Sequence, residues 1–457
     1  MKQKLHKLYE LLWLAAPVVI WFSYYPNIHF GQDETMNFEI SLPLILLALL
    51  ALVSAPYVVR NWRGVFAQKF VWVVSVLSVY SMASMFWSAN PTRGLLTGGI
   101  IGLLYLVFLG AIANKDRLCR LMPRVARVYV TSAVVMSGLA LLQFVLGIWL
   151  PQSTTLLCDG CVSAQFGFPR PNVFAIEPQF FANMLLPAIL ILAHRVMSRG
   201  VKWRLVDDSD YLGIMLLSLF LTMSRGAIYA LVIGLMILAI IHITRLRRVA
   251  VFAGISALTL VASFALQGAA AALSPKVSET FTGAVAKSIN QLSMGVIDIS
   301  QPEPEDETQQ PQVEEGKEAP AFDGYVEEST DIRMGRTEMA LATWGRDVPT
   351  MLFGVGLGGA GVAVQQQFPG QTGAREIVQN EYVERLLERG VIGLTLTLGA
   401  IGWLVYLLRS QKWLWSIIAA LLFQYLLFSG YPNATHVYLV LILVAAAGMS
   451  LKRRETN

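Results

Sequence analysis

Residues 211–244 read YLGIMLLSLFLTMSRGAIYALVIGLMILAIIHIT, and Arg225 is the one charged side chain in that run. A helix that crosses the bilayer core needs about 18–20 apolar residues, so this stretch predicts two spans that meet near Arg225. The chain as a whole is also rich in apolar residues and poor in charged ones. Of its 457 residues, 55% are hydrophobic and 14% are charged, and the mean hydropathy is +0.56. Because soluble domains carry about 25% charged residues, the composition excludes an ordinary soluble enzyme and favours an all-α polytopic membrane protein.

Apolar runs predict twelve transmembrane helices along the chain. They cover residues 9–26, 40–59, 70–88, 94–113, 128–150, 173–193, 211–224, 226–244, 249–271, 390–408, 413–430 and 437–451. Most of the 35 Lys and Arg residues fall in the short segments on one side of these spans, as in cytoplasmic loops. The sequence therefore predicts that both termini are cytoplasmic. The net charge of +5 reports this orientation and gives no reason to expect a nucleic-acid partner.

One long external segment, 272–389, separates a membrane domain of nine spans, 1–271, from one of three spans, 390–457. Its middle, residues 301–331, is rich in Asp, Glu, Pro and Gln, which is typical of a disordered acidic insert.

Two flanks of this segment have helical apolar spacing. They are residues 331–350 and residues 375–390, and the second ends at Gly390, a glycine typical of a helix stop. We expect short amphipathic helices there.

No nucleotide or metal motif is evident. The sequence has neither a P-loop nor an H-E-x-x-H pattern, so we expect no cofactor and no metal. Gly356, Gly358 and Gly361 fit G-x-G-x-x-G, but no strand–turn–helix unit surrounds them. We interpret these glycines as a tight external turn.

The basic residues on the predicted outer side run against the charge bias and need another explanation. They are Arg93, Arg170, Arg225, Lys276, Lys287, Lys317, Arg333, Arg336, Arg346, Arg375, Arg385 and Arg389. A guanidinium at membrane depth is costly unless it meets an anion or lines a wet cavity. Arg225 fits that description, although an arginine at a helix end can also reach the interface and bind a lipid phosphate.

Arg170 lies just before the predicted sixth span, in the segment RPNVFAIEPQFFAN, with Glu177 about two turns further on. Arginine suits the bidentate capture of phosphate oxygens. The alternatives are an ion pair between Arg170 and Glu177, and an acidic residue placed at a helix start by the dipole. Arg333 and Arg336 open the amphipathic stretch, where a solvated helix face is the alternative. Several cations above the outer leaflet suit a lipid-linked diphosphate.

Four segments resemble the O-antigen ligase and polymerase family of bacterial surface-glycan assembly. LTMSRGAIYALVIG (221–234) looks like the family's serine–arginine–glycine turn. IRMGRTEMALATW (332–344), followed by MLFGVGLGG (351–359), resembles its glycine–arginine helix and glycine-rich turn. NEYVERLLERGVIGLTL (380–396) resembles its asparagine–x–tyrosine helix, and RPNVFAIEPQFFAN (170–183) resembles the glutamate–proline segment of polymerase-like members.

The resemblance implies a membrane glycosyltransferase of the C type, with a glycan on undecaprenyl diphosphate as donor. The acceptor is lipid A-core or another lipid-linked glycan. By the same resemblance, Arg225 and Arg170 bind the donor diphosphate, and Arg336 helps from the loop helix. Residues expected to contact substrate are Arg333, Gln379, Asn380, Tyr382 and His436.

This chain departs from the family at one position. The ligases place a histidine before the asparagine, whereas here Gln379 precedes Asn380. Glutamine cannot act as a general base at neutral pH. Glu177 is the preferred substitute, with Glu381 and His436 as alternatives, although a lone histidine such as His436 is more often structural.

The missing histidine and the glutamate–proline segment together favour a polymerase over a ligase. A flippase for lipid-linked sugars, and a scaffold in a glycan-assembly complex, are the alternatives of other classes. The predicted location is the bacterial inner membrane, with the site facing the periplasm. Membrane lipids are expected partners, and a chain-length regulator or another assembly protein is a candidate partner.

Overall fold

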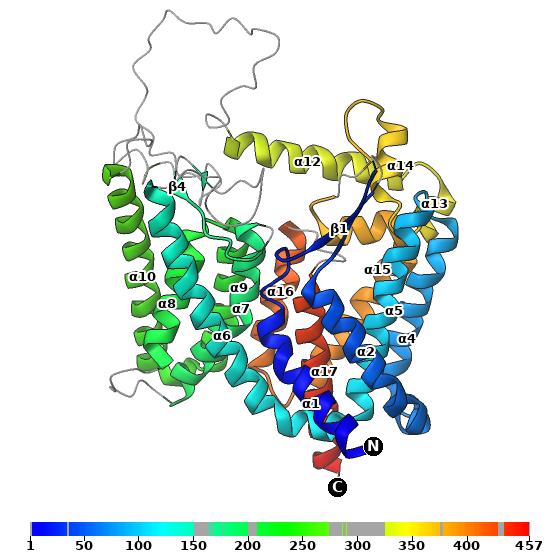
Figure 1. Ribbon diagram of the computed structural model, residues 1–457, viewed down its shortest axis with the longest axis horizontal. Helices are drawn as coiled ribbons and strands as arrows, with labels where there is room; N and C mark the ends of the chain where they lie inside the picture. Colours follow the sequence, from blue (N-terminus) through cyan, green and yellow to red (C-terminus); the bar gives the residue numbers. More distant parts are fainter. Residues whose placement is uncertain are drawn as a thin grey trace, which may run out of the picture.

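The computed structural model describes residues 2–33, 36–149, 164–165, 168–175, 177–199, 208–273, 286, 289, 325–374, 378–427 and 434–456. The described chain is an all-α bundle, as predicted (Figure 1). Seven of its helices are long and apolar enough to cross a membrane, and three shorter helices, residues 225–241, 414–427 and 435–450, are also apolar. These apolar helices are those of a polytopic membrane protein.

Each predicted span overlaps one helix of the described chain. In chain order these helices are α1 (Lys2–Val19), α2 (Leu42–Arg60), α4 (Lys69–Ala83), α5 (Pro91–Ala113), α6 (Lys115–Trp149), α7 (Pro178–Arg199), α8 (Asp208–Leu221), α9 (Arg225–Ile241), α10 (Leu246–Leu273), α15 (Glu381–Leu407), α16 (Leu414–Leu427) and α17 (Thr435–Thr456). The bounds differ from the predicted ones at several ends. Helix α7 begins at Pro178 rather than at residue 173, because the fixed φ of proline suits the first helical position.

Short elements complete the described chain. The antiparallel pairs are β1 (Ile28–Asp33) with β2 (Met36–Ile40), and β3 (Ala164–Gln165) with β4 (Phe168–Pro169). The short helices among the spans are α3 (Trp62–Phe66), η1 (Ser84–Trp87) and η3 (Ile243–Arg245).

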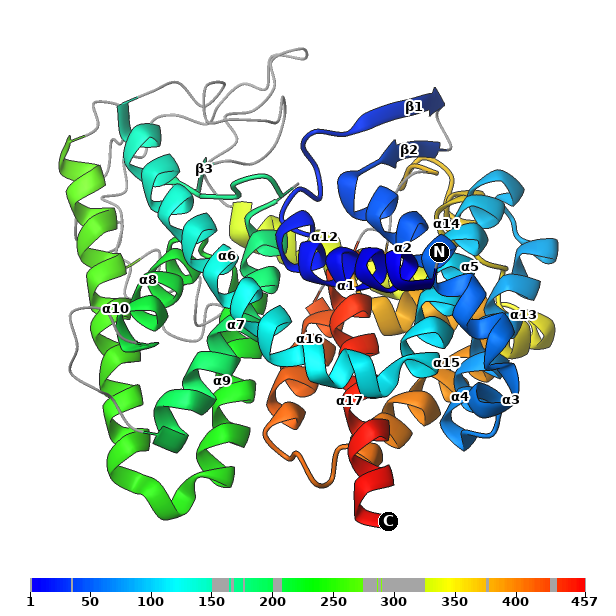
Figure 2. The ribbon, with the colours of Figure 1, turned by 60° about the horizontal axis from the view of Figure 1, so that its bottom comes forward.

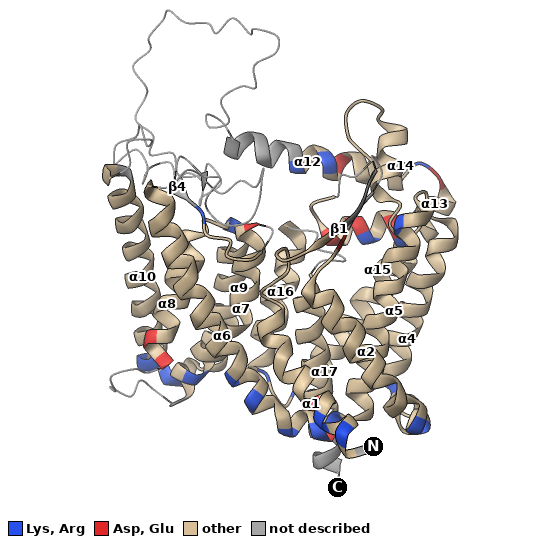
Figure 3. Ribbon diagram, in the orientation of Figure 1, with Lys and Arg blue, Asp and Glu red and all other residues tan. Residues whose placement is uncertain are grey.

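The bundle has two ends, which we name the terminal face and the loop face. The terminal face carries both chain ends, and the loop face carries α12 (Tyr325–Trp344), α13 (Val348–Phe353) and α14 (Ala360–Gln367) (Figure 1). Lys and Arg gather at the terminal face, and both charge signs occur at the loop face (Figure 3). This is the asymmetry that the sequence predicts for a cytoplasmic and an external side.

Two groups of helices flank a central pair. The group α7–α10 lies on one side, α2, α4 and α5 lie on the other, and α16 and α17 stand between them in both views (Figures 1 and 2). Helix α9 packs on α16 and α7, whereas α15 packs on α4. Helix α12 crosses the loop face above the bundle (Figure 1).

The predicted flanking helices are present with changed bounds. The stretch 331–350 forms the C-terminal part of α12 and the start of α13, divided at Gly345–Asp347 where Asp347 caps α13. Helix α12 begins at Tyr325, inside the stretch predicted as a disordered insert, and residues 301–324 lie outside the described residues.

The glycine-rich segment is a tight turn, as predicted. Gly354, Gly356 and Gly358 have positive φ, and a Cβ on Gly356 would lie 2.3 Å from the Cα of Ser88. The turn docks on α15 where that helix breaks at Gly390 (φ 64°). There the N–H groups of Val355 and Gly356 donate to the carbonyls of Leu387 and Glu388, at 2.8 and 2.9 Å. The loop therefore satisfies carbonyl groups that the break releases.

Candidate functional site

Arg225 is the first residue of α9, on the loop face. The turn before it, residues 222–224, follows directly on α8. Ser224 caps α9 by accepting a hydrogen bond from the N–H of Ala227, and Met223 adopts a left-handed backbone (φ 51°). The Arg225 side chain is half-buried at a helix N-terminus, where the dipole favours anions and disfavours cations. Its position therefore calls for an anion nearby.

Arg170 lies in a second irregular segment, residues 170–175. Val173 there also has a left-handed backbone (φ 53°), which is rare for a β-branched residue. Gln143 of α6 holds this turn: its side-chain oxygen accepts from the N–H groups of Asn172 (3.1 Å) and Val173 (2.9 Å). Its amide group donates to the side-chain oxygen of Asn172 at 2.9 Å. Because Gln143 and Asn172 are buried, this network fixes the backbone on which Arg170 stands.

The two irregular segments are in contact. The Nε of Arg170 donates to the carbonyl oxygen of Thr222 at 2.8 Å, three residues before Arg225. Val173 and Met223 are the non-glycine residues with positive φ in the described chain, and one lies in each segment. Strained backbone of this kind concentrates at functional sites. The strained backbone and the contact between the two segments therefore both lie beside Arg170 and Arg225, the two arginines that the sequence most favours as functional residues.

Helix α12 adds two more arginines to this region. Arg333 lies close enough to Arg225 for their two positive charges to repel. Arg336 is three residues further along, so it shares a face of α12 with Arg333. We call Arg170, Arg225, Arg333 and Arg336 the arginine cluster. Arg170 and Arg333 beside Arg225 at the N-terminus of α9, with Arg336 one turn further along α12, form a region of high positive potential.

Glu177 lies next to the cluster at the start of α7. Its side chain is exposed, and its carbonyl oxygen accepts from the N–H groups of Phe180 and Phe181. Two residues on, Gln179 packs against Gly226, and the side-chain amide of Gln179 lies 3.4 Å from where a Cβ on Gly226 would stand. The starts of α7 and α9 are therefore adjacent.

The residues that begin α15 have clear local roles. Asn380 caps the helix by accepting from the N–H groups of Tyr382 (3.1 Å) and Val383 (3.2 Å). The hydroxyl of Tyr382 donates to the carbonyl oxygen of Leu422 at 2.9 Å and so joins α15 to α16. Gln379 is half-buried just before this cap. The asparagine–x–tyrosine motif thus fixes where α15 starts and how it meets its neighbour.

His436 lies in the first turn of α17 and is 3% exposed. Its Nε2 has no hydrogen-bond partner among the described residues. The structure thus places His436 inside the bundle.

Sequence reasoning missed two features of the site. Gln143 was not singled out, although a glutamine in an otherwise apolar span is itself a signal. The second feature is a row of buried charges in the first turns of α15. These are Glu381, Glu384, Arg385, Glu388 and Arg389. Arg385 donates to Glu381 at 2.7 Å and to the hydroxyl of Tyr438 at 2.9 Å. Their spacing of three and four residues was visible in the sequence.

The fold and the cluster define a helical membrane protein with an anion site at one end of its bundle. Residues 211–398 match the family model described as O-antigen ligase. The match confirms the family resemblance predicted from the sequence. It supports glycan transfer of the ligase or polymerase type in polysaccharide assembly, with lipid-linked glycan substrates in general. No curated protein matches the chain.

The matched segment runs from α8 into the middle of α15. It contains Arg225, Arg333, Arg336, Asn380 and Tyr382. Arg170, Glu177 and His436 lie outside it. The contacts of Arg170 with Thr222 and of Gln179 with Gly226 join the glutamate–proline segment to the matched segment.

Proposed function

We propose that the chain transfers a glycan from undecaprenyl diphosphate to a sugar hydroxyl at the periplasmic face, as an O-antigen or exopolysaccharide polymerase. The observation that carries this proposal is the arginine cluster, in which Arg170 contacts the turn before Arg225 and Arg333 approaches from α12. The family domain over residues 211–398 supports the class of reaction.

In this proposal the cluster binds the diphosphate of the donor. Guanidinium groups match phosphate oxygens in geometry and charge, and the N-terminus of α9 adds its dipole. When the glycan leaves, negative charge grows on the departing diphosphate. Fixed positive groups in a site with little water stabilise that charge, and removing one such interaction typically slows a reaction about 100- to 1000-fold.

The transfer step forms one bond and breaks one bond. The acceptor hydroxyl oxygen attacks the anomeric carbon, the bond from that carbon to the diphosphate oxygen breaks, and the configuration inverts. The hydroxyl proton needs an acceptor. Glu177 is our candidate, because it is an exposed carboxylate at the start of α7, next to the start of α9.

The choice of polymerase over ligase rests on Gln379, which stands where the ligases have a histidine, together with the glutamate–proline segment at residues 170–183. The ligase reaction, with lipid A-core as acceptor, is the second candidate, because the matching family model is described as O-antigen ligase.

The test is an assay with purified full-length protein and a lipid-linked glycan donor. Lipid A-core and a second lipid-linked glycan are offered as rival acceptors. Extension of the lipid-linked glycan supports a polymerase, and transfer to lipid A-core supports a ligase. Movement of the glycan across vesicle membranes without a new bond would instead indicate a flippase, and no reaction at all would indicate a scaffold.

Two variants connect the assay to the cluster. Arg225→Ala should reduce transfer by about 100-fold or more. Arg346→Ala is the matched control, since Arg346 is another loop-face arginine, exposed and paired with Asp347 at 3.0 Å. Equal activity in both variants would contradict the assigned role of Arg225.

A further inference from the structure

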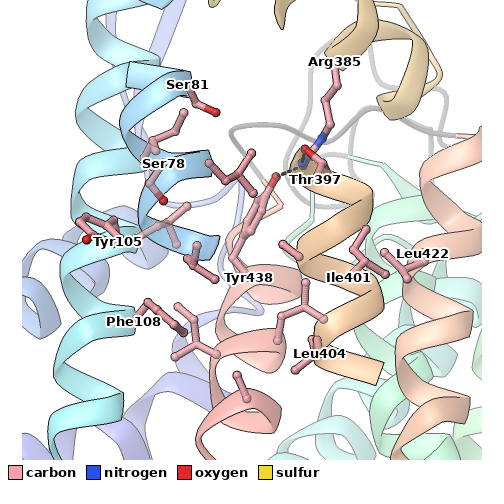
Figure 4. Close-up of a pocket in the computed structure, with 18 of the residues that line it drawn as sticks. Ser78, Ser81, Tyr105, Phe108, Arg385, Thr397, Ile401, Leu404, Leu422 and Tyr438 are labelled. Atoms are coloured by element: carbon pink, nitrogen blue, oxygen red, sulfur yellow. Dashed lines mark hydrogen bonds between the residues drawn. The ribbon is translucent and has the colours of Figure 1, made fainter. Parts of the chain in front are cut away.

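A cavity of about 200 Å³ lies in the membrane part of the bundle, apart from the arginine cluster. Helices α4, α5, α15, α16 and α17 line it, whereas the cluster stands on α9, α12 and the segment before α7. Figure 4 shows apolar side chains such as Phe108, Ile401 and Leu404 along it and Arg385 at one end. The cavity is therefore an elongated apolar space with a polar end.

The polar end is on the loop face. Arg385 and Arg389 stand there, before the break of α15 at Gly390, and they are the charged groups among the described lining residues. The apolar part lies beyond the break and extends along α4 from Ser81 to Phe70. Phe70 and Ser81 are eleven residues apart on α4, which corresponds to a rise of about 16 Å along the helix. This is about half the thickness of a bilayer core.

Neighbouring groups hold Arg385 in a fixed position. Its Nε donates to Glu381 at 2.7 Å, one NH₂ group donates to the hydroxyl of Tyr438 at 2.9 Å, and the guanidinium lies 5.8 Å from the ring centre of Tyr425. Figure 4 shows Arg385 reaching Tyr438 at the top of the cavity. Arg389 donates to the hydroxyl of Ser81 at 3.3 Å. Charges at membrane depth are costly, and such residues commonly mark a ligand pathway.

We propose that this cavity binds a lipid phosphate, with its hydrocarbon chain among the five helices and its phosphate at Arg385 and Arg389. The apolar walls match a hydrocarbon chain, and the charged lining groups at the loop face, Arg385 and Arg389, are hydrogen-bond donors. On the proposed function, on which this step rests, the occupant is the second lipid-linked substrate, because a glycan transfer between two lipids needs two lipid sites. The arginine cluster serves the other lipid.

Photo-crosslinking of the purified full-length protein tests this proposal directly. The probe is a polyprenyl phosphate with a diazirine in its chain, and mass spectrometry locates the label. Ser78→Phe fills the cavity from α4, so labelling of the cavity helices should fall about tenfold, a loss of 1.4 kcal/mol in binding. Val79→Phe is the matched control, because Val79 is the next residue of α4 and is 56% exposed. It should label as the unmodified protein does.

A second variant covers the case in which Ser78→Phe does not fold. Ala445→Phe fills the cavity from α17 and should also reduce labelling about tenfold. Unchanged labelling in a folded cavity variant would overturn the proposal.

Competitors identify the part of the probe that is recognised. Unlabelled polyprenyl phosphate should displace the probe, and polyprenol should do so less well because it lacks the phosphate. Inorganic diphosphate should not displace it, since it lacks the chain. Equal displacement by polyprenol would overturn the role of the two arginines, and displacement by inorganic diphosphate alone would show a free-anion site instead of a lipid site.

The Arg225→Ala variant separates this proposal from the proposed function. It should label normally in the cavity while losing glycan transfer. Cavity labelling without transfer by the unmodified protein would refute the proposed function and leave the lipid site standing. Transfer that is insensitive to both cavity variants would refute the assigned role of the lipid.

Discussion

Arg225 lies at a position where its positive charge lowers the stability of the fold. It is the first residue of α9, where a positive charge opposes the helix dipole, and Arg333 adds repulsion. A charge of the wrong sign at a helix end costs about 0.3–1 kcal/mol. On the proposed function, this cost is offset by binding of the donor diphosphate at Arg225.

This argument predicts opposite effects of Arg225→Gln on stability and on activity. Without substrate, the free energy of unfolding should rise by about 0.5 kcal/mol, because the repulsion is removed. Glycan transfer should be lost. Thermal unfolding in detergent and the transfer assay measure the two effects. Arg409→Gln, an exposed arginine on the terminal face, should change neither, and a lower unfolding temperature for Arg225→Gln would make Arg225 a structural residue.

Gln143 is the residue that we expect to matter most without touching substrate. Gln143→Leu leaves the buried N–H groups of Asn172 and Val173 without their acceptor. An unsatisfied buried donor costs about 1–3 kcal/mol, so thermal unfolding should shift downward by that amount and transfer should weaken as Arg170 moves. Ser137→Ala on the same helix removes a buried hydroxyl without a hydrogen-bond partner in the described chain. A shift as large in Ser137→Ala would mean that Gln143 has no special role.

The sequence predicted residues that are unusual in their own segment, and it did not predict residues whose role depends on distant segments. Arg170 and Arg225 were found because a charge in an apolar chain is visible without knowing its partners. Gln143 acts across thirty residues on a backbone turn, and nothing in its own segment shows that target. Arg385 was counted among the outer arginines, but its burial depends on α16 and α17 packing around α15.

At the scale of elements, the sequence predicted where the membrane helices lie, but it did not show what packs against an interruption. Hydrophobic length locates a span, because the bilayer core has a fixed thickness. The glycine stop at Gly390 was predicted correctly, whereas its use was not. The break lets the turn at Gly354–Gly358 dock on α15 and places two arginines above an apolar cavity. Such docking depends on segments far apart in sequence, so local patterns do not show it.

Helix α13 gives a prediction about pH. Hydrogen bonds from the N–H and the hydroxyl of Thr350 lower the pKa of Asp347 below its ordinary value of 3.8. A carboxylate with a lowered pKa in the folded state stabilises that state above its unfolded pKa, and this contribution is lost as the pH falls through the folded pKa. Protection of the α13 amides from hydrogen exchange should therefore decrease below pH 3.8.

The matched variant for this prediction is Asp347→Asn. Asparagine keeps a side-chain oxygen that can cap the helix, but it does not titrate. Protection of α13 should then be lower at neutral pH and independent of pH in the acid range. The same acid-induced loss in Asp347→Asn would assign the effect to another group.

At the scale of the whole molecule, the distribution of charge and the position of the short helices both indicate how the bundle is oriented in the membrane. Lys and Arg gather at the terminal face, and the loop face carries α12–α14, with Arg333 and Arg336 on α12 (Figures 1 and 3). Cytoplasmic loops are enriched in basic residues. The cluster would then face the periplasm, where a translocated lipid-linked glycan presents its diphosphate.

Cysteine accessibility in intact cells tests this orientation. Arg346→Cys places a thiol on the loop face, and Arg409→Cys places one between α15 and α16 on the terminal face, both at exposed arginines. Cys119, Cys158 and Cys161 are replaced by serine in the background. A maleimide that cannot cross the inner membrane should label Arg346→Cys in intact cells and Arg409→Cys only after permeabilisation. The reverse pattern would place the arginine cluster in the cytoplasm, out of reach of an external glycan, and would refute the proposed polymerase.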